Sequence, residues 1–345
     1  MLQLRSRADY RLAVEDASDA IKAARVICIF FMTYVHVHLF TSVDLAASPQ
    51  YQLATSIIRD VLGRASVPLL SVVSGFLLVG YLSRRSLKQV VANRSTTLLM
   101  PVITWNLIGI VVFSVLGWLD GIGMNDLFPL LDHGFQHHLT FLRDLFVVSV
   151  LSPVLIWALK RAPAFTVIAI ILVAAFIDTW PIILRAQILL YFTLGLLFGL
   201  YRLETFPIYK ASKQIAYIAF CILLVQVALN GTKPLNKHFE LTTWVMQPIS
   251  VLTFWGLAQW VATKQGLMGI TRILEPAIFL FYLSHFITAQ IFSAIYAQLE
   301  FAHTPWIYTT VWVVIPVMCL LAALAGRWVM HRLPDMLSVV VIGKA

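Results

Sequence analysis

Apolar residues form long runs along the chain, and short polar segments separate them. A helix needs about 20 apolar residues to cross the hydrocarbon core of a membrane, so these runs predict ten spans. The spans cover residues 23–41, 61–82, 95–117, 139–159, 165–180, 184–201, 214–230, 241–262, 273–298 and 308–330. The fifth and sixth spans are the weakest, because Asp178, Pro181 and Arg185 lie between them. These two predict either a tight helical hairpin or one long broken helix.

The composition supports an all-α, polytopic membrane protein. Of the 345 residues, 60% are hydrophobic and 12% are charged, whereas a soluble domain has about one quarter charged residues. These values exclude an ordinary soluble domain, a disordered chain and a nucleic-acid-binding protein. We therefore expect a single membrane domain over residues 1–345, in which residues 1–22 form a cytoplasmic N-terminal segment.

Positive charge is distributed unevenly between alternate loops, and this predicts the orientation of the chain. The net charge is +9. When the N-terminus is placed inside, the inner segments hold most of the lysines and arginines, and few remain in the outer loops. Cytoplasmic loops carry an excess of these residues. The pattern therefore predicts that both termini lie on the cytoplasmic side.

The first predicted span carries the strongest candidate chemistry. Arg25 and His36 are 11 residues apart, which is about three helical turns or roughly 16 Å, so both lie on nearly the same helix face. Ionisable groups in a membrane are costly and therefore mark candidate sites. Arg25 is predicted to orient an anionic donor, and His36 to act as a general base. The alternative is that His36 is a structural hydrogen-bonding residue and that Arg25 reaches toward lipid head groups.

Other polar residues in the spans are candidates for an acceptor site or a cavity lining. The set is Asp19, Arg64, Ser74, Arg143, Asp144 and His285. Ser74 precedes Gly75, and such a pair of small residues also predicts close helix packing. Arg143 and Asp144 are adjacent, so we expect them to point to different sides of a helix and to need separate partners or a water-filled cavity. His285 is expected either to relay protons with His36 or to form a structural hydrogen bond.

Basic residues near the inner ends of the spans are candidates for binding a phosphate-rich donor. They are Lys22, Arg84, Arg85 and Arg94. The alternative is that they only orient the chain in the membrane. No metal site is expected, because the adjacent His137 and His138 would rarely converge on one ion, and no bound cofactor is expected either.

Five motifs resemble those of the acyltransferase 3 family of bacterial integral-membrane glycan O-acyltransferases. Arg25-x10-His36 is similar to the family's Arg/Lys-to-His signature, and VPLLSVVSGFLL at 67–78 resembles its P-x-F-F-x-x-S-G-F-L-L motif. RSTTLLMPVITW, HLTFLRDLFVVSVLSP and FLFYLSHF resemble three later family motifs. The matches follow the family order over nearly the whole chain.

The resemblance implies an enzyme of the bacterial inner membrane that moves an acyl group to a glycan hydroxyl. The acyl group would most often be acetyl from acetyl-CoA as co-substrate, and in some members succinyl. The acceptor would be a cell-surface or secreted polysaccharide or its lipid-linked precursor. His36 would be the base, and an acyl-His36 intermediate is a variant. Membrane lipids are expected partners, polysaccharide-assembly proteins or a second copy are left open, and nucleic acid is not expected.

Two other classes of protein remain alternatives at this point. Ten spans with histidine, arginine and aspartate inside them also fit a proton-coupled secondary transporter. A non-catalytic subunit of a polysaccharide-export complex is the second alternative. Consumption of the thioester with release of free CoA would separate an enzyme from a carrier.

Overall fold

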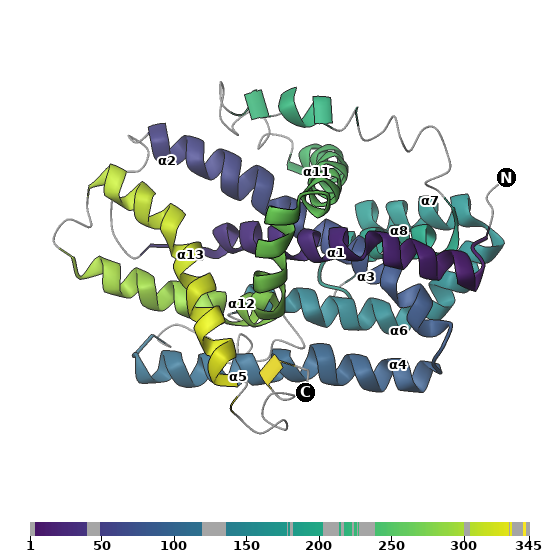
Figure 1. The fold of residues 1–345 in the computed structure, drawn as a ribbon, viewed down its shortest axis with the longest axis horizontal. Coiled ribbons are helices and arrows are strands. Elements are labelled where there is room, and N and C mark those ends of the chain that lie inside the picture. The colour runs from purple at the N-terminus through teal and green to yellow at the C-terminus, as the bar shows by residue number, and fades with distance from the viewer. Residues whose placement is uncertain are drawn as a thin grey trace. The chain divides into compact units, whose positions relative to one another are not determined.

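The structure is a computed structural model that describes residues 4–39, 49–118, 136–177, 179, 182–202, 214, 217–222, 224, 225, 227, 239–299, 304–330, 332, 341 and 342. Within these residues every regular element is helical, apart from one isolated bridge between Leu4 and Tyr201 (Figure 1). The predicted all-α class is therefore confirmed. Of the predicted span 214–230, the structure describes positions 214, 217–222, 224, 225 and 227, and each of these is helical.

The other nine predicted spans each coincide with a described helix. These helices are α1 (Arg7–His36), α3 (Ser66–Leu82), α5 (Met100–Val115), α6 (Thr140–Arg161), α7 (Pro163–Phe176), α8 (Ala186–Leu200), α11 (Phe239–Ala262), α12 (Gln265–Ala297) and α13 (Pro305–Met330). Shorter helical elements precede three of them. Before α3 lie α2 (Pro49–Ala54), the π-helix η2 (Thr55–Leu62) and the 3-10 helix η3 (Gly63–Ala65). Helix α4 (Leu87–Arg94) and the π-helix η4 (Ser95–Leu99) lie before α5, and the 3-10 helix η6 (His137–Leu139) lies before α6.

Five helical stretches of the described chain are long and apolar enough to cross a membrane. They are Tyr51–Leu82, Leu87–Val115, His137–Arg161, Gln265–Ala297 and Pro305–Met330. Large apolar side chains on these and other helices are exposed, for example Leu107 and Val111 on α5 and Phe165 on α7, as expected where lipid covers the protein. The chain is thus a multi-pass membrane protein, while ten spans and the orientation stay predictions.

Helices α7 and α8 decide between the two alternatives for the fifth and sixth spans. They have 14 and 15 residues and are separate helices in mutual contact. They therefore form a hairpin rather than one broken helix. Each is shorter than the roughly 20 residues that an untilted helix needs to span the hydrocarbon core.

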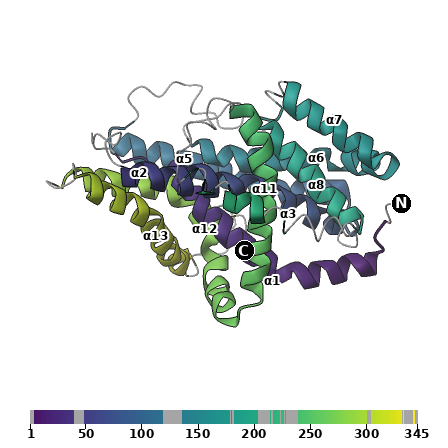
Figure 2. The ribbon, with the colours of Figure 1, turned by 90° about the horizontal axis from the view of Figure 1, so that it is seen from above.

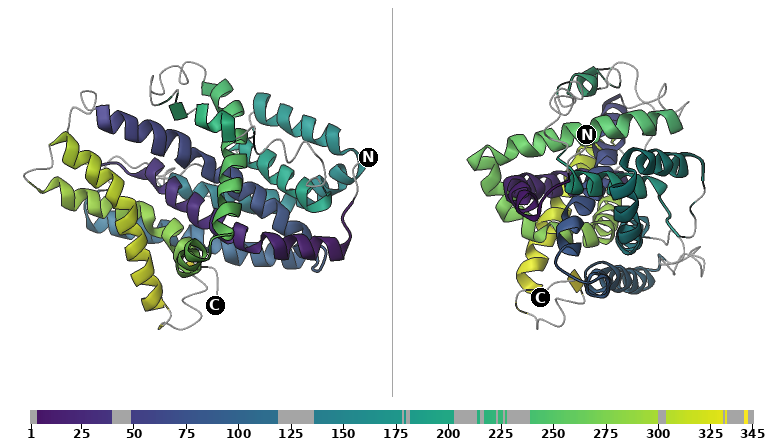
Figure 3. Two further views of the ribbon diagram at one scale, coloured as in Figure 1. Left: turned by 45° about the horizontal axis from the view of Figure 1, so that its top comes forward. Right: turned by 90° about the vertical axis from the view of Figure 1, so that its right-hand side faces the viewer.

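Two compact units make up the chain, and their boundaries fall within α1, α3 and α13 and after Leu203. The first unit contains Met1–Ala17, Leu70–Leu203 and Trp328–Ala345, and in it α6, α7 and α8 pack on one another (Figure 2). The second contains Ser18–Leu69 and Glu204–Arg327, and in it α11 contacts α12, η2 and η3 (Figure 3). A single domain over the whole chain stays a prediction.

Glycines allow α3 and α8 of the first unit to approach each other closely. A Cβ atom on Gly75 would lie 2.2 Å from the carbonyl oxygen of Phe192, and one on Gly195 would lie 2.1 Å from that of Val72. Small residues at helix interfaces in membranes let the backbones meet in this way. The close packing predicted at Ser74–Gly75 is therefore confirmed at Gly75.

We predict that Gly195→Ala destabilises the protein by about 1–3 kcal/mol, because the new methyl group would overlap backbone atoms that cannot rotate away. Gly269→Ala in α12 is the matched control, since a Cβ atom added there would have nothing within 4 Å. Alanine is also the better helix former by about 1 kcal/mol. Thermal unfolding in detergent should show a lower midpoint for Gly195→Ala and an unchanged or higher one for Gly269→Ala. Equal midpoints would contradict close α3–α8 packing.

Candidate active site

Helices α1 and α12 lie side by side and run in the same direction within the second unit. Four contacts follow one another along both helices: Asp19 to Arg272, Arg25 to Glu275, Phe30 to Phe281, and His36 to His285. The partner number rises along both helices, so the pair is parallel. Arg25 and His36 both face α12, which confirms that they share one face of α1.

Two histidines meet where α1 ends. The ring centroids of His36 and His285 are 5.5 Å apart, and their planes are inclined by 53°. His36 is the last residue of α1 and is partly exposed, whereas His285 is fully buried. The Nδ1 atom of His285 lies 2.7 Å from the carbonyl oxygen of Tyr282. Because a carbonyl only accepts, we assign the proton of His285 to Nδ1 and acceptor character to Nε2.

Helix α13 fixes the end of α1 that carries His36. The hydroxyl of Tyr34 donates to the carbonyl oxygen of Val313 at 2.8 Å, and Nε1 of Trp312 donates to that of Val37 at 3.3 Å. Carbonyl groups at a helix end lack partners within the helix, so Trp312 satisfies one at this end. The two hydrogen bonds determine where the chain leaves α1 and thereby position His36.

The other end of this helix pair is joined by an ion pair. Nη1 of Arg25 lies 2.5 Å from Oε1 of Glu275, and both side chains are largely covered. The pairing offsets the cost of placing an arginine among apolar helices. The motifs in the sequence do not single out Glu275. The available signal is its spacing, because Glu275 precedes His285 by ten residues much as Arg25 precedes His36 by eleven.

Nearly two turns before Arg25, Asp19 contacts two positively charged side chains. It accepts from Lys22 at 3.0 Å and from Arg272 at 3.3 Å. The hydrogen bond from Lys22, and then the one from Arg272, lower the pKa of the Asp19 carboxyl. Its ionised form therefore stabilises the folded state above the usual pKa of aspartate, and this contribution is lost as the pH falls through the lowered value. Lys22, a predicted donor ligand, already contacts Asp19.

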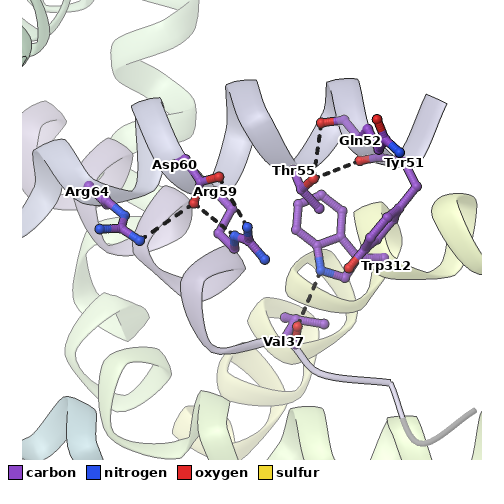
Figure 4. A network of polar contacts seen from close by, with 8 residues as sticks. All are labelled: Val37, Tyr51, Gln52, Thr55, Arg59, Asp60, Arg64 and Trp312. Carbon is purple, nitrogen blue, oxygen red and sulfur yellow. Dashed lines mark hydrogen bonds and ion pairs between the residues drawn. The ribbon is translucent and has the colours of Figure 1, made fainter. Parts of the chain in front are cut away.

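A cluster of two arginines around one carboxylate lies in the helical segment before α3 (Figure 4). Nε and Nη2 of Arg59 contact the two Asp60 oxygens at 2.9 and 3.1 Å, which is a bidentate pair. Nη2 of Arg64 lies 3.7 Å from Oδ1 of the same residue. Arg59 and Asp60 belong to the π-helix η2, and π-helical turns often occur at functional sites.

In the first unit, Arg143 and Asp144 pair with each other, which corrects the expectation of separate partners. Nη1 of Arg143 lies 2.8 Å from Oδ1 of Asp144 and also donates to the carbonyl of Ile182. Asp144 is fully buried and accepts from the backbone N–H groups of Leu184 and Arg185. Adjacent residues point in different directions around a helix, but the long arginine side chain reaches the carboxylate of its neighbour. Through the contacts with Ile182, Leu184 and Arg185, the pair joins α6 to the start of α8.

The remaining predicted residues of the first unit lie on α3, α4 and the turn between them. Ser74 is half-buried on α3. Arg84 and Arg85 occupy the exposed turn, where the Arg85 guanidinium lies 4.6 Å over the ring of Tyr81. A capping box at Ser86 starts α4 after this turn. Arg94 ends α4, and its Nε is buried without a hydrogen-bond partner among the described residues.

The structure combines membrane-spanning helices with a buried and a partly buried histidine and with nearby cationic side chains. Such a combination is typical of membrane-embedded enzymes and carriers. Residues 18–328 match the family model described as an acyltransferase domain. The chain therefore belongs to the acyltransferase 3 family and is a multi-pass membrane acyltransferase. No curated protein and no solved structure gives a significant match.

We predict that Asp144→Ala lowers stability by about 3–5 kcal/mol, because it leaves a buried arginine without its carboxylate. The double variant with Arg143→Ala should lose less than the sum of the single losses. The measurements are thermal unfolding in detergent and the amount of protein in the membrane. Arg161→Gln is the control, since this exposed arginine lies over Trp157 at the end of α6. A stable but inactive Asp144→Ala protein would instead favour the predicted role at the acceptor site.

Proposed function

We propose that the protein transfers an acetyl group from acetyl-CoA to a hydroxyl of a cell-surface or secreted polysaccharide, or of its lipid-linked precursor, in the inner membrane of a bacterium. The family membership supports acyl transfer. The observation that carries the proposal is the His36–His285 pair, because an alcohol attacks a thioester only when a base removes its proton.

In the proposed reaction His36 takes the proton of the acceptor hydroxyl. The hydroxyl oxygen then bonds to the thioester carbonyl carbon, and the carbon–sulfur bond breaks. The proton held by His36 passes to the departing CoA sulfur, so the enzyme returns to its starting state. The partly exposed position of His36 at the end of α1 suits contact with a substrate.

His285 is proposed to assist His36 rather than to contact the substrate. It is fully buried, and its Nδ1 is engaged with the carbonyl of Tyr282. That hydrogen bond directs the acceptor nitrogen, Nε2, away from the Tyr282 carbonyl. His285 therefore suits a role in orienting the His36 ring or in sharing its proton.

Arg25 is proposed to orient the donor or to stabilise negative charge that develops on the thioester oxygen. A guanidinium has five N–H donors, and the Glu275 contact involves Nη1. Arg25 has the capacity to hold Glu275 and a substrate oxygen together. The carboxylate keeps the guanidinium in place before the substrate arrives, which is the preorganisation that such stabilisation needs.

Basic side chains are proposed to hold the phosphate groups of CoA. The candidates are Lys22 in the second unit and Arg84, Arg85 and Arg94 in the first. Arg94 has the strongest support, because its buried Nε–H would donate a hydrogen bond to an anionic ligand. Arg84 and Arg85 are exposed and suit attraction of the donor by charge.

We predict that His36→Ala lowers acyl transfer at least ~100-fold, the usual scale for loss of a general base. The full chain in detergent would be supplied with radiolabelled acetyl-CoA and a glycan fraction, and both label transfer and free CoA would be measured. The exposed His137→Ala is the histidine control. Transfer at the normal rate by purified His36→Ala protein would refute the role of His36. No free CoA from the wild-type protein would refute the proposed reaction.

A second prediction separates the chemical role of Arg25 from its structural one. Arg25→Glu with Glu275→Arg reverses the ion pair, so the double variant should regain thermal stability lost in either single variant. The acyl transfer rate of the double variant should stay at least ~100-fold below that of the wild type, because the positive charge then lies on α12 instead of α1. Recovery of both properties would show that only the pairing matters.

A further inference from the structure

Helix α12 carries two buried polar side chains beyond His285, Gln290 and Ser293, which we call the polar pair. Gln290 is 8% exposed and Ser293 is fully buried. The Oε1 atom of Gln290 and the Oγ atom of Ser293 have no hydrogen-bond partner among the described residues. A buried polar atom is costly unless it is hydrogen-bonded. Residues three apart on a helix are neighbours, so one ligand can pair with both atoms.

The polar pair lies beyond the point where α1 ends. Helices α1 and α12 are parallel; α1 ends at His36, whereas α12 continues past His285. Gln290 and Ser293 follow His285 by roughly 8 and 12 Å along the helix axis. Ser293 also follows Glu275 by about five full turns, so both lie on nearly the same side of α12. Glu275 contacts α1, and Ser293 therefore continues the α1-facing side of α12 beyond His36.

Aromatic side chains of the second unit lie next to the polar pair. Tyr296 is nearly one turn beyond the pair on α12, and its ring centroid is 6.4 Å from that of Tyr308. Tyr51 lies 5.3 Å from Tyr308 and 5.9 Å from Trp312. The hydrogen bond from Trp312 to Val37 joins this cluster to the chain that leaves α1 (Figure 4). A few polar groups within an aromatic and apolar lining are typical of small-molecule sites.

The chemistry of the polar pair favours an uncharged ligand with hydroxyl groups. An amide has an acceptor and a donor end, and a serine hydroxyl does both. A sugar hydroxyl also donates and accepts, so it satisfies either orientation of the amide. An ionised carboxylate or phosphate only accepts and would leave Oε1 of Gln290 unpaired. Residues 276–298 and 305–326 contain no lysine, arginine, aspartate or glutamate, so α12 and α13 offer no countercharge for an anion there.

We propose that Gln290 and Ser293 bind hydroxyl groups of an uncharged sugar unit of the acceptor and position it next to His36. Their unpaired atoms gain hydrogen bonds only when the acceptor is bound. The two side chains are thus positioning residues that select the acceptor and take no part in proton transfer. This inference rests on the proposed function for the identification of the bound sugar as the acceptor.

The first test measures sugar binding to the full chain in phosphatidylcholine nanodiscs. The probes are trisaccharides of glucose, galactose and mannose, each with its fully O-methylated counterpart, which lacks hydroxyl donors. The wild type should bind at least one trisaccharide more tightly than its methylated counterpart. Gln290→Leu and Ser293→Ala should each weaken that binding about fivefold, or ~1 kcal/mol, because each removes one hydrogen bond.

Thermal unfolding in a detergent without sugar head groups separates a ligand site from a structural role. Because both atoms lack partners in the free protein, Gln290→Leu and Ser293→Ala should keep or raise the unfolding midpoint. Ser152→Ala is the matched control. Ser152 is as fully buried as Ser293, but its hydroxyl donates to the carbonyl oxygen of Ser149 at 2.6 Å. Ser152→Ala should therefore leave sugar binding unchanged and should not raise the midpoint.

Equal binding of every trisaccharide and its methylated counterpart by the wild type would overturn the inference. A lower midpoint for both variants would do the same, because it would reveal structural partners of the two atoms. Full sugar binding by the double variant would assign the atoms to ordered water only. Acyl transfer is measured separately, so a wild type that binds the sugars but releases no CoA would refute the proposed reaction and not the sugar site.

Discussion

The ion pair between Arg25 and Glu275 fixes the register of α1 against α12. Two opposite charges in apolar surroundings attract strongly, and each is costly alone. A slip by one residue would turn one partner by about 100° around its helix and separate the charges. Because the register is fixed at this end, His36 and His285 meet about three turns farther along. The geometry of the histidine pair thus depends on a contact that is remote from it.

The dipeptide Arg-Asp occurs twice in the described chain with different consequences. At Arg143–Asp144 the carboxylate is fully buried and also accepts backbone N–H groups at the start of α8. Helix α8 has no side-chain cap of its own, so Asp144 supplies the negative charge that favours a helix N-terminus. At Arg59–Asp60 the arginine is considerably more exposed. Burial, rather than residue type, therefore distinguishes the two pairs.

Hydropathy predicted the helices well because each span is set by local composition. The shared face of Arg25 and His36 was also predictable, since it follows from helical periodicity alone. Glu275 was not, because its partner lies 250 residues away and no local pattern records such a contact. The expectation that Arg143 and Asp144 have separate partners was wrong, because helical angles describe Cβ directions and not the reach of an arginine.

The parallel course of α1 and α12 constrains how often the chain crosses the membrane. If both helices cross it, both do so in the same sense, and the chain between them must return to the side from which it started. The number of crossings between His36 and Gln265 is then odd. The seven spans predicted in this interval satisfy that parity, whereas six or eight would not. The contacts between two helices thereby carry information about the topology of more than two hundred residues.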